Sequence, residues 1–303
     1  MEFEVMCEGL EFPEGPIAMP DGSVILVEIK RRTLTRVHPD GRTEVIAETG
    51  GGPNGAAFGP DGKVYLCNNG GFEWSDSTGF LRPSGMANDY ATGSIQRVDI
   101  ATGAVETLFT ECDGIALRGP NDIVFSADGG FWFTDLGKSN AEWMHHGAFY
   151  HARPDGAVAR VRGTMVTCNG IGLSPDGTEV YVAETRTGRL WAFEVEGPGQ
   201  VAPPRDGRPG RLVTTLPDYR MIDSLAVQEN GHVCLATLNS GGISIVDPVS
   251  GEVEYVQFPG DPMITNICFG GEDMRDAYVT ASGTGVLYKV RWPYAGLRLE
   301  FNG

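Results

Sequence analysis

The chain has 303 residues, of which 43 are glycine and 19 are proline, and 41% of its residues are hydrophobic. This is a turn-rich globular composition, and it excludes an intrinsically disordered chain. The net charge of -17 at pH 7 argues against nucleic acid and against an anionic membrane surface as partners, because both need a basic face on the protein.

The first residues and the cysteines predict a cytoplasmic protein. Residues 1–10 carry glutamates and no long apolar stretch, so we expect no signal peptide. No run of about 18 apolar residues occurs, so we expect no membrane span. The six cysteines have no C-x-x-C spacing, which argues against a zinc or redox motif, and most lie in apolar runs as buried thiols.

A pair of polar residues recurs six times along the chain. The first member, which we call the anchor, is Glu, Asp or Asn, and an Asp or Asn follows seven residues later. The pairs are Glu14 and Asp21, Asn54 and Asp61, Asn121 and Asp128, Asn169 and Asp176, Asp223 and Asn230, and Asn266 and Asp273. In the first five pairs Gly follows the second member, and such Asp-Gly and Asn-Gly steps are the strongest short-range hairpin signal.

Each repeat predicts short strands around its turn. A first apolar strand follows the anchor, as in residues 56–58, and a second strand follows the turn, as in residues 64–67. Third and fourth strands are readable in most repeats, for example in residues 33–37 and 43–46. Four antiparallel strands repeated six times are typical of propeller blades. We therefore predict an all-β fold, a six-bladed β-propeller with four-stranded antiparallel blades around a central tunnel, as a single domain over residues 1–303.

The ends of the repeats and the longer connections complete this prediction. The ring must close, so residues 3–6 are expected to pair with the last blade, whose repeat ends near Leu299. Residues 70–93 and 137–147 are long insertions and are predicted to be functional lids or disordered loops. Residues 196–211 are rich in Pro and Gly and are expected to form an outer loop without a function.

The anchors predict a metal site in the tunnel. The first strand of a propeller blade lines the central channel, so pseudo-symmetry puts all six anchors in one ring. The ring has two carboxylates, four carboxamides and neither Cys nor His, a donor set that suits Ca²⁺, Mg²⁺ or Mn²⁺. Two carboxylates in one enclosed tunnel repel each other unless a cation or a proton lies between them. Asn side chains also hydrogen-bond turn backbones, so Asn54 and Asn266 are open to a purely structural role.

Four motifs surround the anchors. They are Phe12-Pro13-Glu14-Gly15-Pro16, Gly119-Pro120-Asn121-Asp122, the run from Cys168 to Gly177, and Ile222-Asp223-Ser224-Leu225. Together they resemble the motifs of the SMP-30/gluconolactonase/luciferin-regenerating-enzyme family, over essentially the whole chain. The resemblance implies a six-bladed propeller with one divalent ion in its tunnel and a lactonase activity on sugar lactones or related lactones.

The resemblance also implies roles for individual residues. Glu14, Asn169 and Asp223 would ligate the metal, and Asn121 would ligate it or contact the substrate beside it. The ion would be Ca²⁺, with Mg²⁺, Mn²⁺, Zn²⁺ and Fe²⁺ as alternatives. Asp223 would also be the catalytic base, because the matching Asp of the family touches both metal and water. Asp135 resembles an acid that lies beside the metal or holds an additional calcium ion in some members.

One departure from the family bears on the substrate. Sugar-lactonase members carry an Arg two residues before the counterpart of Asn121, whereas this chain has Gly119 there. The departure leaves open a more apolar lactone or ester. Arg118, one residue further away, and the loop residues Trp74 and Trp143 are expected to contact the substrate, together with Asn121.

The function expected from the sequence is that of a divalent-metal-dependent hydrolase, gluconolactonase-like, that opens a small lactone to its hydroxy acid. The metal would polarise the carbonyl group while Asp223 takes a proton from water. Two alternatives remain open. One is an arylesterase or phosphotriesterase on the same scaffold, and the other is a non-catalytic propeller that binds a ligand or a protein.

Overall fold

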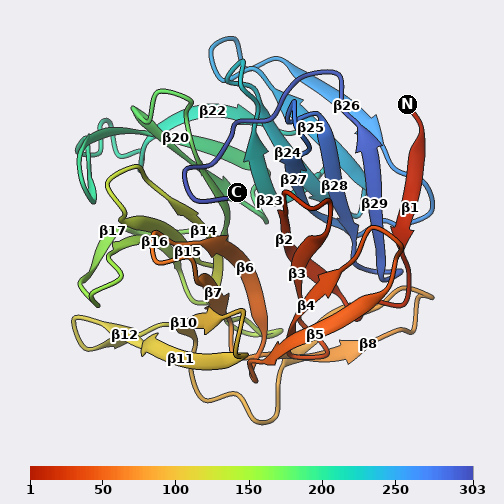
Figure 1. Ribbon diagram of the computed structural model, residues 1–303. Helices are drawn as coiled ribbons and strands as arrows, with labels where there is room; N and C mark the ends of the chain where they lie inside the picture. The colour runs from red at the N-terminus through yellow and green to blue at the C-terminus, as the bar shows by residue number, and fades with distance from the viewer. Residues whose placement is uncertain (303) are drawn as a thin grey trace.

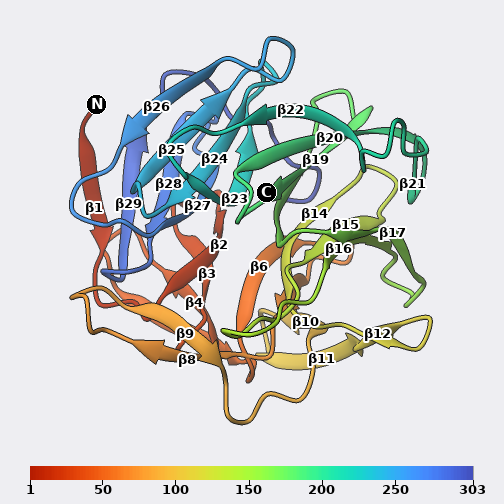
Figure 2. The ribbon, with the colours of Figure 1, turned by 180° about the vertical axis from the view of Figure 1, so that it is seen from behind.

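The computed structural model describes residues 1–302. Six antiparallel sheets are arranged in a ring around a central axis (Figures 1 and 2), which confirms the predicted six-bladed β-propeller. Over residues 1–302 there is no α-helix, and therefore none with the length and apolar character that crossing a membrane requires. The innermost strand of each blade is the strand that begins with the anchor motif.

The blades follow one another in chain order, each with four antiparallel strands. Blades 1 and 2 are β2 (Pro13–Ala18), β3 (Val24–Glu28), β4 (Thr33–Val37), β5 (Thr43–Glu48), then β6 (Pro53–Phe58), β7 (Val64–Asn68), β10 (Ser94–Asp99), β11 (Ala104–Phe109). Blades 3 and 4 are β14 (Pro120–Phe125), β15 (Phe131–Asp135), β16 (Gly147–Ala152), β17 (Val158–Met165), then β18 (Cys168–Leu173), β19 (Glu179–Glu184), β20 (Arg189–Gly197), β22 (Arg211–Thr215). Blades 5 and 6 are β23 (Met221–Val227), β24 (Val233–Leu238), β25 (Gly242–Val246), β26 (Val253–Gln257), then β27 (Ile264–Gly270), β28 (Asp276–Ala281), β29 (Val286–Arg291), β1 (Phe3–Cys7).

The second member of each polar pair makes the predicted turn. In all six repeats its side-chain oxygen accepts the backbone N–H two residues further on, at 2.9–3.3 Å. In the first five repeats the following glycine has φ between 69° and 89°, which costs glycine no steric strain. The sixth repeat lacks this glycine, and Met274 takes the left-handed conformation with φ 56°.

The ring is closed by the N-terminal strand, as predicted. Strand β1 pairs antiparallel with β29, with Phe3 opposite Val290, and so becomes the fourth strand of blade 6. The prediction that the sixth repeat ends near Leu299 is wrong, because β29 ends at Arg291 and β1 already occupies the outer edge. Residues 292–302 instead form a C-terminal tail that crosses one end of the tunnel (Figure 1).

Apolar residues pack between neighbouring blades and hold the ring together. Tyr181 and Ala183 of β19, for example, pack with Leu225 and Val227 of β23 in one buried cluster. The side chain of Trp292, at the beginning of the tail, is fully buried against blade 6. Because every blade covers the face of the next, the innermost strands are fixed relative to one another.

The insertions between strands have some structure of their own. Residues 70–93 contain the hairpin of β8 (Phe72–Ser75) and β9 (Arg82–Met86), and the N–H of Leu81 donates to the carbonyl of Gly283 at 2.9 Å. A bridge between Ser139 and Met144 closes the loop 137–147. The predicted outer loop 196–211 contains the end of β20 and the short strand β21 (Gln200–Val201). The short hairpin of β12 (Glu111–Cys112) and β13 (Ile115–Ala116) precedes blade 3.

Candidate metal centre

All six anchors lie at the beginning of an innermost strand, and all are buried, with 2–8% of each residue exposed. In every blade the register between the first and second strands shifts at or beside the anchor. A β-bulge of this kind takes a residue out of the regular alternation of the strand and re-aims its side chain. The repeated irregularity therefore marks the anchor layer as a built feature of the fold.

Glycines beside three anchors let the innermost strands approach closely. A Cβ atom on Gly15 would lie 2.5 Å from the carbonyl oxygen of Asn54, and one on Gly55 would lie 2.6 Å from that of Asn121. A Cβ atom on Gly170 would lie 2.8 Å from the backbone nitrogen of Leu225. Any larger residue at these positions would push two blades apart. The glycine after the anchor thus keeps the ring narrow.

Two carboxamide oxygens of the ring have no hydrogen-bond partner. They are Oδ1 of Asn121 and Oδ1 of Asn169, and both are buried. The amide nitrogen of Asn169 donates to Oγ1 of Thr185 at 3.1 Å, which orients the amide and leaves its carbonyl oxygen available. A buried polar atom without a partner costs about 1–3 kcal/mol, so such atoms call for an explanation. Ligation of a cation by these two oxygens would supply one.

The two carboxylates of the ring are unusually hard to ionise. Burial raises the pKa of Glu14 to about 7. Burial and then the charge of Glu14 raise the pKa of Asp223 well above its usual range. A cation between carboxylates reverses both effects, because opposite charge favours the ionised form. Two carboxylates and two carboxamide oxygens are hard ligands, and they fit Ca²⁺ or another oxygen-seeking divalent ion.

The ring differs from metal sites built of acids, cysteines and histidines alone. Over residues 1–302, no group of three or more His, Cys, Asp and Glu side chains is arranged to hold a metal ion. Half of the proposed donors are carboxamides, and the case for this site therefore depends on the unpartnered oxygens of Asn121 and Asn169.

A third buried carboxylate, Asp122, lies beside the anchors, and the repeat pattern predicts no role for it. Its carboxylate accepts the N–H of Ile123 at 2.9 Å and that of Ile171 in the next blade at 3.4 Å. Burial and then the charge of Glu14 raise its pKa to about 7. The sequence carried a signal for it, because no other anchor is followed by an acidic residue.

Asn266 acts on the site through Glu14. Its amide nitrogen donates to Oε2 of Glu14 at 2.7 Å, and the N–H of Gly15 donates to the same oxygen at 2.8 Å. Oδ1 of Asn266 in turn accepts the N–H of Ile267 at 2.8 Å, which fixes the orientation of the amide. Asn266, open to a purely structural role on the sequence alone, therefore orients a proposed ligand. The backbone of Asn54 lies against Gly15, and this contact is structural.

Side chains at the ends of the second strands form hydrogen bonds with the backbone segment that precedes the innermost strand of the same blade. In four blades a polar side chain at the end of the second strand accepts a backbone N–H from this segment, at 2.7–2.8 Å. The pairs, acceptor first, are Glu28 with Glu11, Asn68 with Gly52, Asp135 with both Arg118 and Gly119, and Glu184 with Val166. Asp135 also accepts the N–H of Gly137 at 2.8 Å. With three backbone donors on its carboxylate, Asp135 acts as a clamp on the segment before Asn121.

Besides Asn121, the other three residues predicted to contact substrate lie on separate segments. Arg118 is exposed, and its carbonyl oxygen accepts the hydroxyl of Tyr90 at 2.9 Å. Trp74 is partly buried, and its ring packs against Phe12 of a core cluster, with ring centroids 4.9 Å apart. Trp143 is 40% exposed on the loop 137–147.

A side chain at Gly119 would force the neighbouring loop to shift. A Cβ atom there would lie 2.7 Å from the carbonyl oxygen of Gly137. The loop that follows β15 therefore packs closely against Gly119.

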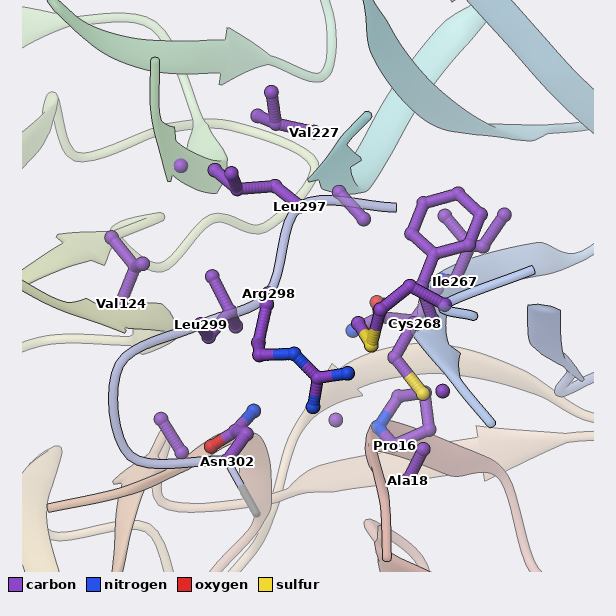
Figure 3. Close-up of a pocket in the computed structure, with 18 of the residues that line it drawn as sticks. Pro16, Ala18, Val124, Val227, Ile267, Cys268, Leu297, Arg298, Leu299 and Asn302 are labelled. Atoms are coloured by element: carbon purple, nitrogen blue, oxygen red, sulfur yellow. Dashed lines mark hydrogen bonds between the residues drawn. The ribbon is translucent and has the colours of Figure 1, made fainter. Parts of the chain in front are cut away.

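A cavity of about 430 Å³ occupies the part of the tunnel between the anchor layer and the C-terminal tail (Figure 3). It reaches the anchor layer at Gly15, Asp122 and Asn266. Its walls are the apolar side chains of the innermost strands, among them Val124, Val227 and Ile267.

Comparisons with known proteins agree with the fold. A family model described as "SMP-30/Gluconolactonase/LRE-like region" matches residues 12–283. A gluconolactonase of Zymomonas mobilis is 24% identical, with 92% of this chain and 78% of that protein covered. A crystal structure of a calcium-binding protein, regucalcin, from Agrobacterium tumefaciens superposes with a TM-score of 0.73 at 20% identity, covering 98% of each chain. A gluconolactonase structure from Xanthomonas campestris superposes with a TM-score of 0.74 at 21% identity, covering 96% of this chain and 89% of that one.

Proposed function

This chain belongs to the SMP-30/gluconolactonase/LRE-like family, and we propose that it is a divalent-metal-dependent lactonase that opens a small lactone ring to the hydroxy acid. The similarity to a gluconolactonase at 24% identity supports the lactone-hydrolysing class. The observation that carries the proposal for this chain is the pair of buried, unpartnered carboxamide oxygens on Asn121 and Asn169, in one layer with two buried carboxylates.

We propose Glu14, Asn121, Asn169 and Asp223 as the metal ligands. Ca²⁺ is the ion that we favour, with Mg²⁺, Mn²⁺, Zn²⁺ and Fe²⁺ as alternatives. All four donors are oxygens, and a similar structure is that of a calcium-binding protein. The chemistry that a bound divalent cation supplies is Lewis-acid polarisation of the lactone carbonyl.

Asp223 is the residue that we propose as the general base. Ester hydrolysis needs a water that loses a proton as it attacks, and a buried carboxylate at the reacting centre can accept that proton. Oγ of Ser224, the next residue, is buried without a partner, and no Gly-x-Ser-x-Gly motif surrounds it as a nucleophile would need. Asn121 would hold the substrate beside the metal, and Arg118, Trp74 and Trp143 remain the proposed contacts with the rest of the substrate.

The six cysteines support one further part of the proposal. All are unpaired thiols, which suits a reducing compartment such as the cytoplasm.

The test is hydrolysis of a panel of lactones, followed by a pH indicator. The protein is assayed as purified, after EDTA, and after addition of Ca²⁺, Mg²⁺, Mn²⁺, Zn²⁺ or Fe²⁺. Lactone opening that EDTA abolishes and one of these ions restores supports the proposal. The same panel includes an aryl ester and a phosphotriester. Turnover of these substrates alone would support the esterase alternative, and no turnover with metal still bound would support a binding propeller.

A further inference from the structure

Two buried hydrogen-bond donors lie near the end of the tunnel opposite the C-terminal tail. They are the side-chain amide of Asn69, in blade 2, and the ammonium group of Lys138, in the loop 137–147 of blade 3. Asn69 is 2% exposed and Lys138 is 4% exposed. The tail contacts Phe58 at the end of β6, whereas the N–H of Asn69 donates to the carbonyl of Gly52, just before this strand begins, at 2.8 Å. Asn69 therefore lies on the side of the anchor layer away from the tail.

The repeat places the side chain of Asn69 beside the anchor layer. Its counterpart in blade 4 is Thr185, whose N–H likewise donates to the carbonyl two residues before the anchor, that of Thr167, at 3.1 Å. Oγ1 of Thr185 accepts the side-chain amide of the anchor Asn169 at 3.1 Å. Because the blades repeat the same arrangement, the side chain of Asn69 lies at the same level in blade 2. A Cβ atom on Gly52 would clash with Oδ1 of Asn69, so the amide covers the backbone just before the anchor of that blade.

The amide nitrogen of Asn69 has no partner among residues 1–302. Oδ1 of Asn69 accepts the N–H of Gly71 at 2.8 Å, which fixes the orientation of the amide. Nδ2 points away from this bond and is buried without a hydrogen-bond acceptor. A buried donor without a partner costs free energy, so this nitrogen indicates a bound acceptor, as the oxygens of Asn121 and Asn169 indicate a bound cation.

The ammonium group of Lys138 reaches the same region from blade 3. Nζ donates to the carbonyl of Gly71 at 3.2 Å, and a Cβ atom on Gly52 would lie 2.7 Å from Cα of Gly71. The ring centroids of Phe72 and Tyr90 lie 4.3 and 4.9 Å from Nζ. These contacts hold the ammonium group in place. Among residues 1–302, however, only one hydrogen-bond acceptor meets its three N–H groups.

The positive charge of Lys138 is not neutralised by a direct contact. Burial lowers the pKa of Lys138 to about 8, while the charge of Asp135 acts in the opposite direction, so the side chain is charged at pH 7. The oxygens of Asp135 accept three backbone N–H groups rather than the ammonium group. Because Asn69 and Lys138 hold the N–H and the carbonyl of the same residue, Gly71, a neutral donor and a cation lie close together.

We propose that Asn69 and Lys138 form a subsite that binds a carboxylate substituent of the lactone, beside the metal centre. Both groups donate hydrogen bonds and neither offers a free acceptor, because Oδ1 of Asn69 is already bonded to Gly71. A carboxylate only accepts hydrogen bonds, whereas the proton of a hydroxyl group would stay unpaired here. Each oxygen of the carboxylate accepts one of the two donors. The assignment to a substrate rests on the proposed lactonase function, whereas the binding of a carboxylate does not.

Cyclopentanecarboxylate is the probe, because it has the ring and the carboxylate of such a lactone but cannot be hydrolysed. The protein is freed of metal with EDTA and then dialysed, so that neither a metal ion nor EDTA interferes, and calorimetry is run at pH 7. We expect the carboxylate to bind more tightly than cyclopentanol. Asn69→Asp keeps the acceptor for Gly71 and replaces the free donor by an acceptor, and Lys138→Met removes the charge. Each variant should weaken the carboxylate about tenfold or more, because hydrogen bonds to charged groups are the strong ones.

Two matched variants serve as controls. Asn140 also uses Oδ1 to accept backbone N–H groups, those of Glu142 and Trp143 at 2.9 Å, but it is exposed, so Asn140→Asp should not change the affinity. Lys30 is an exposed lysine at the same end of the tunnel, where its N–H donates to the carbonyl of Glu11, and Lys30→Met should not change the affinity either.

The lactonase assay tests the assignment to the substrate. Hydroxyglutarate γ-lactone carries a carboxylate on its ring, and γ-valerolactone has a methyl group in its place. Asn69→Asp and Lys138→Met should each lower the ratio of kcat/KM for the first lactone to that for the second about tenfold. An unchanged ratio in both variants, with lactone hydrolysis intact, would refute this assignment.

Three results of the calorimetry would overturn the proposal as a whole. They are the absence of binding of cyclopentanecarboxylate, equal affinity for cyclopentanol, and an affinity that neither Asn69→Asp nor Lys138→Met changes. None of them depends on turnover, so the calorimetry decides on the subsite even if the protein hydrolyses no lactone.

Discussion

Removing the divalent ion should make the stability of this protein fall as the pH rises from 5 to 8. Burial raises the pKa of Glu14 from its ordinary value of 4.5 to about 7, and that of Asp122 from 3.8 to about 7. A carboxyl whose pKa is higher in the folded state binds its proton more tightly there than in the unfolded chain. Its contribution to stability is complete below the unfolded pKa, near 4, and is lost as the pH rises through 7.

The size of the effect follows from the two shifts. Each pKa unit corresponds to about 1.4 kcal/mol, so the shift of Glu14 amounts to about 3 kcal/mol and that of Asp122 to about 4 kcal/mol. The two carboxyls interact, so their contributions do not add independently. Because part of each shift lies below pH 5, we expect the metal-free protein to lose at least roughly 2.5 kcal/mol between pH 5 and 8, out of the roughly 5–15 kcal/mol typical of a folded domain.

Urea unfolding followed by tryptophan fluorescence measures this loss. The protein is compared in EDTA and in Ca²⁺, and Ca²⁺ should flatten the pH dependence because a cation lowers the pKa of the carboxyls around it. Glu14→Gln and Asp122→Asn should each remove part of the slope in EDTA. Asp176→Asn is the control, since the hydrogen bonds of its turn lower the pKa of Asp176 to about 2, and it should not change the slope above pH 5. A free energy of unfolding in EDTA that stays constant or rises from pH 5 to 8 would refute the reasoning.

Four other predictions test the site. Glu14→Gln and Asp223→Asn should each lose most of the bound metal in elemental analysis, since each removes one of two central charges, and unchanged metal in both would put the site elsewhere. Metal-saturated Asp223→Asn should remain about 10²–10⁴-fold slower on a lactone and lose the acidic limb of its pH–rate profile, whereas full rescue by metal would make Asp223 a ligand only. Asn266→Ala should weaken metal affinity roughly tenfold, because it removes the amide that orients the carboxylate of Glu14, and a titration with unchanged affinity would contradict this. Gly119→Ala should lower the melting temperature, because the new Cβ atom would lie 2.7 Å from the carbonyl oxygen of Gly137. An unchanged melting temperature in calorimetry would show that the loop after β15 can move.

Much of the fold could be predicted from the sequence, because the patterns that specify its turns and strands are local and occur six times. The Asp-Gly turn at Asp61 is fixed by a side-chain bond to a backbone group two residues away, and the same bond recurs in every blade. The closing role of residues 3–6 followed from the need to cover an open sheet edge. The prediction that the sixth repeat extends to Leu299 is wrong, because nothing local in the sequence distinguishes a fourth strand from a segment that crosses the tunnel.

The sequence by itself determined which residues meet in the tunnel, because an anchor at one fixed position of each repeat must lie in one layer of a ring. It also determined their chemistry, two carboxylates among four carboxamides. Only the tertiary structure decided how these residues divide their tasks. Contacts between blades left the oxygens of Asn121 and Asn169 without partners and turned the amide of Asn266 toward Glu14. The repeat makes these anchors equivalent along the chain, whereas their hydrogen bonds depend on neighbours from other blades.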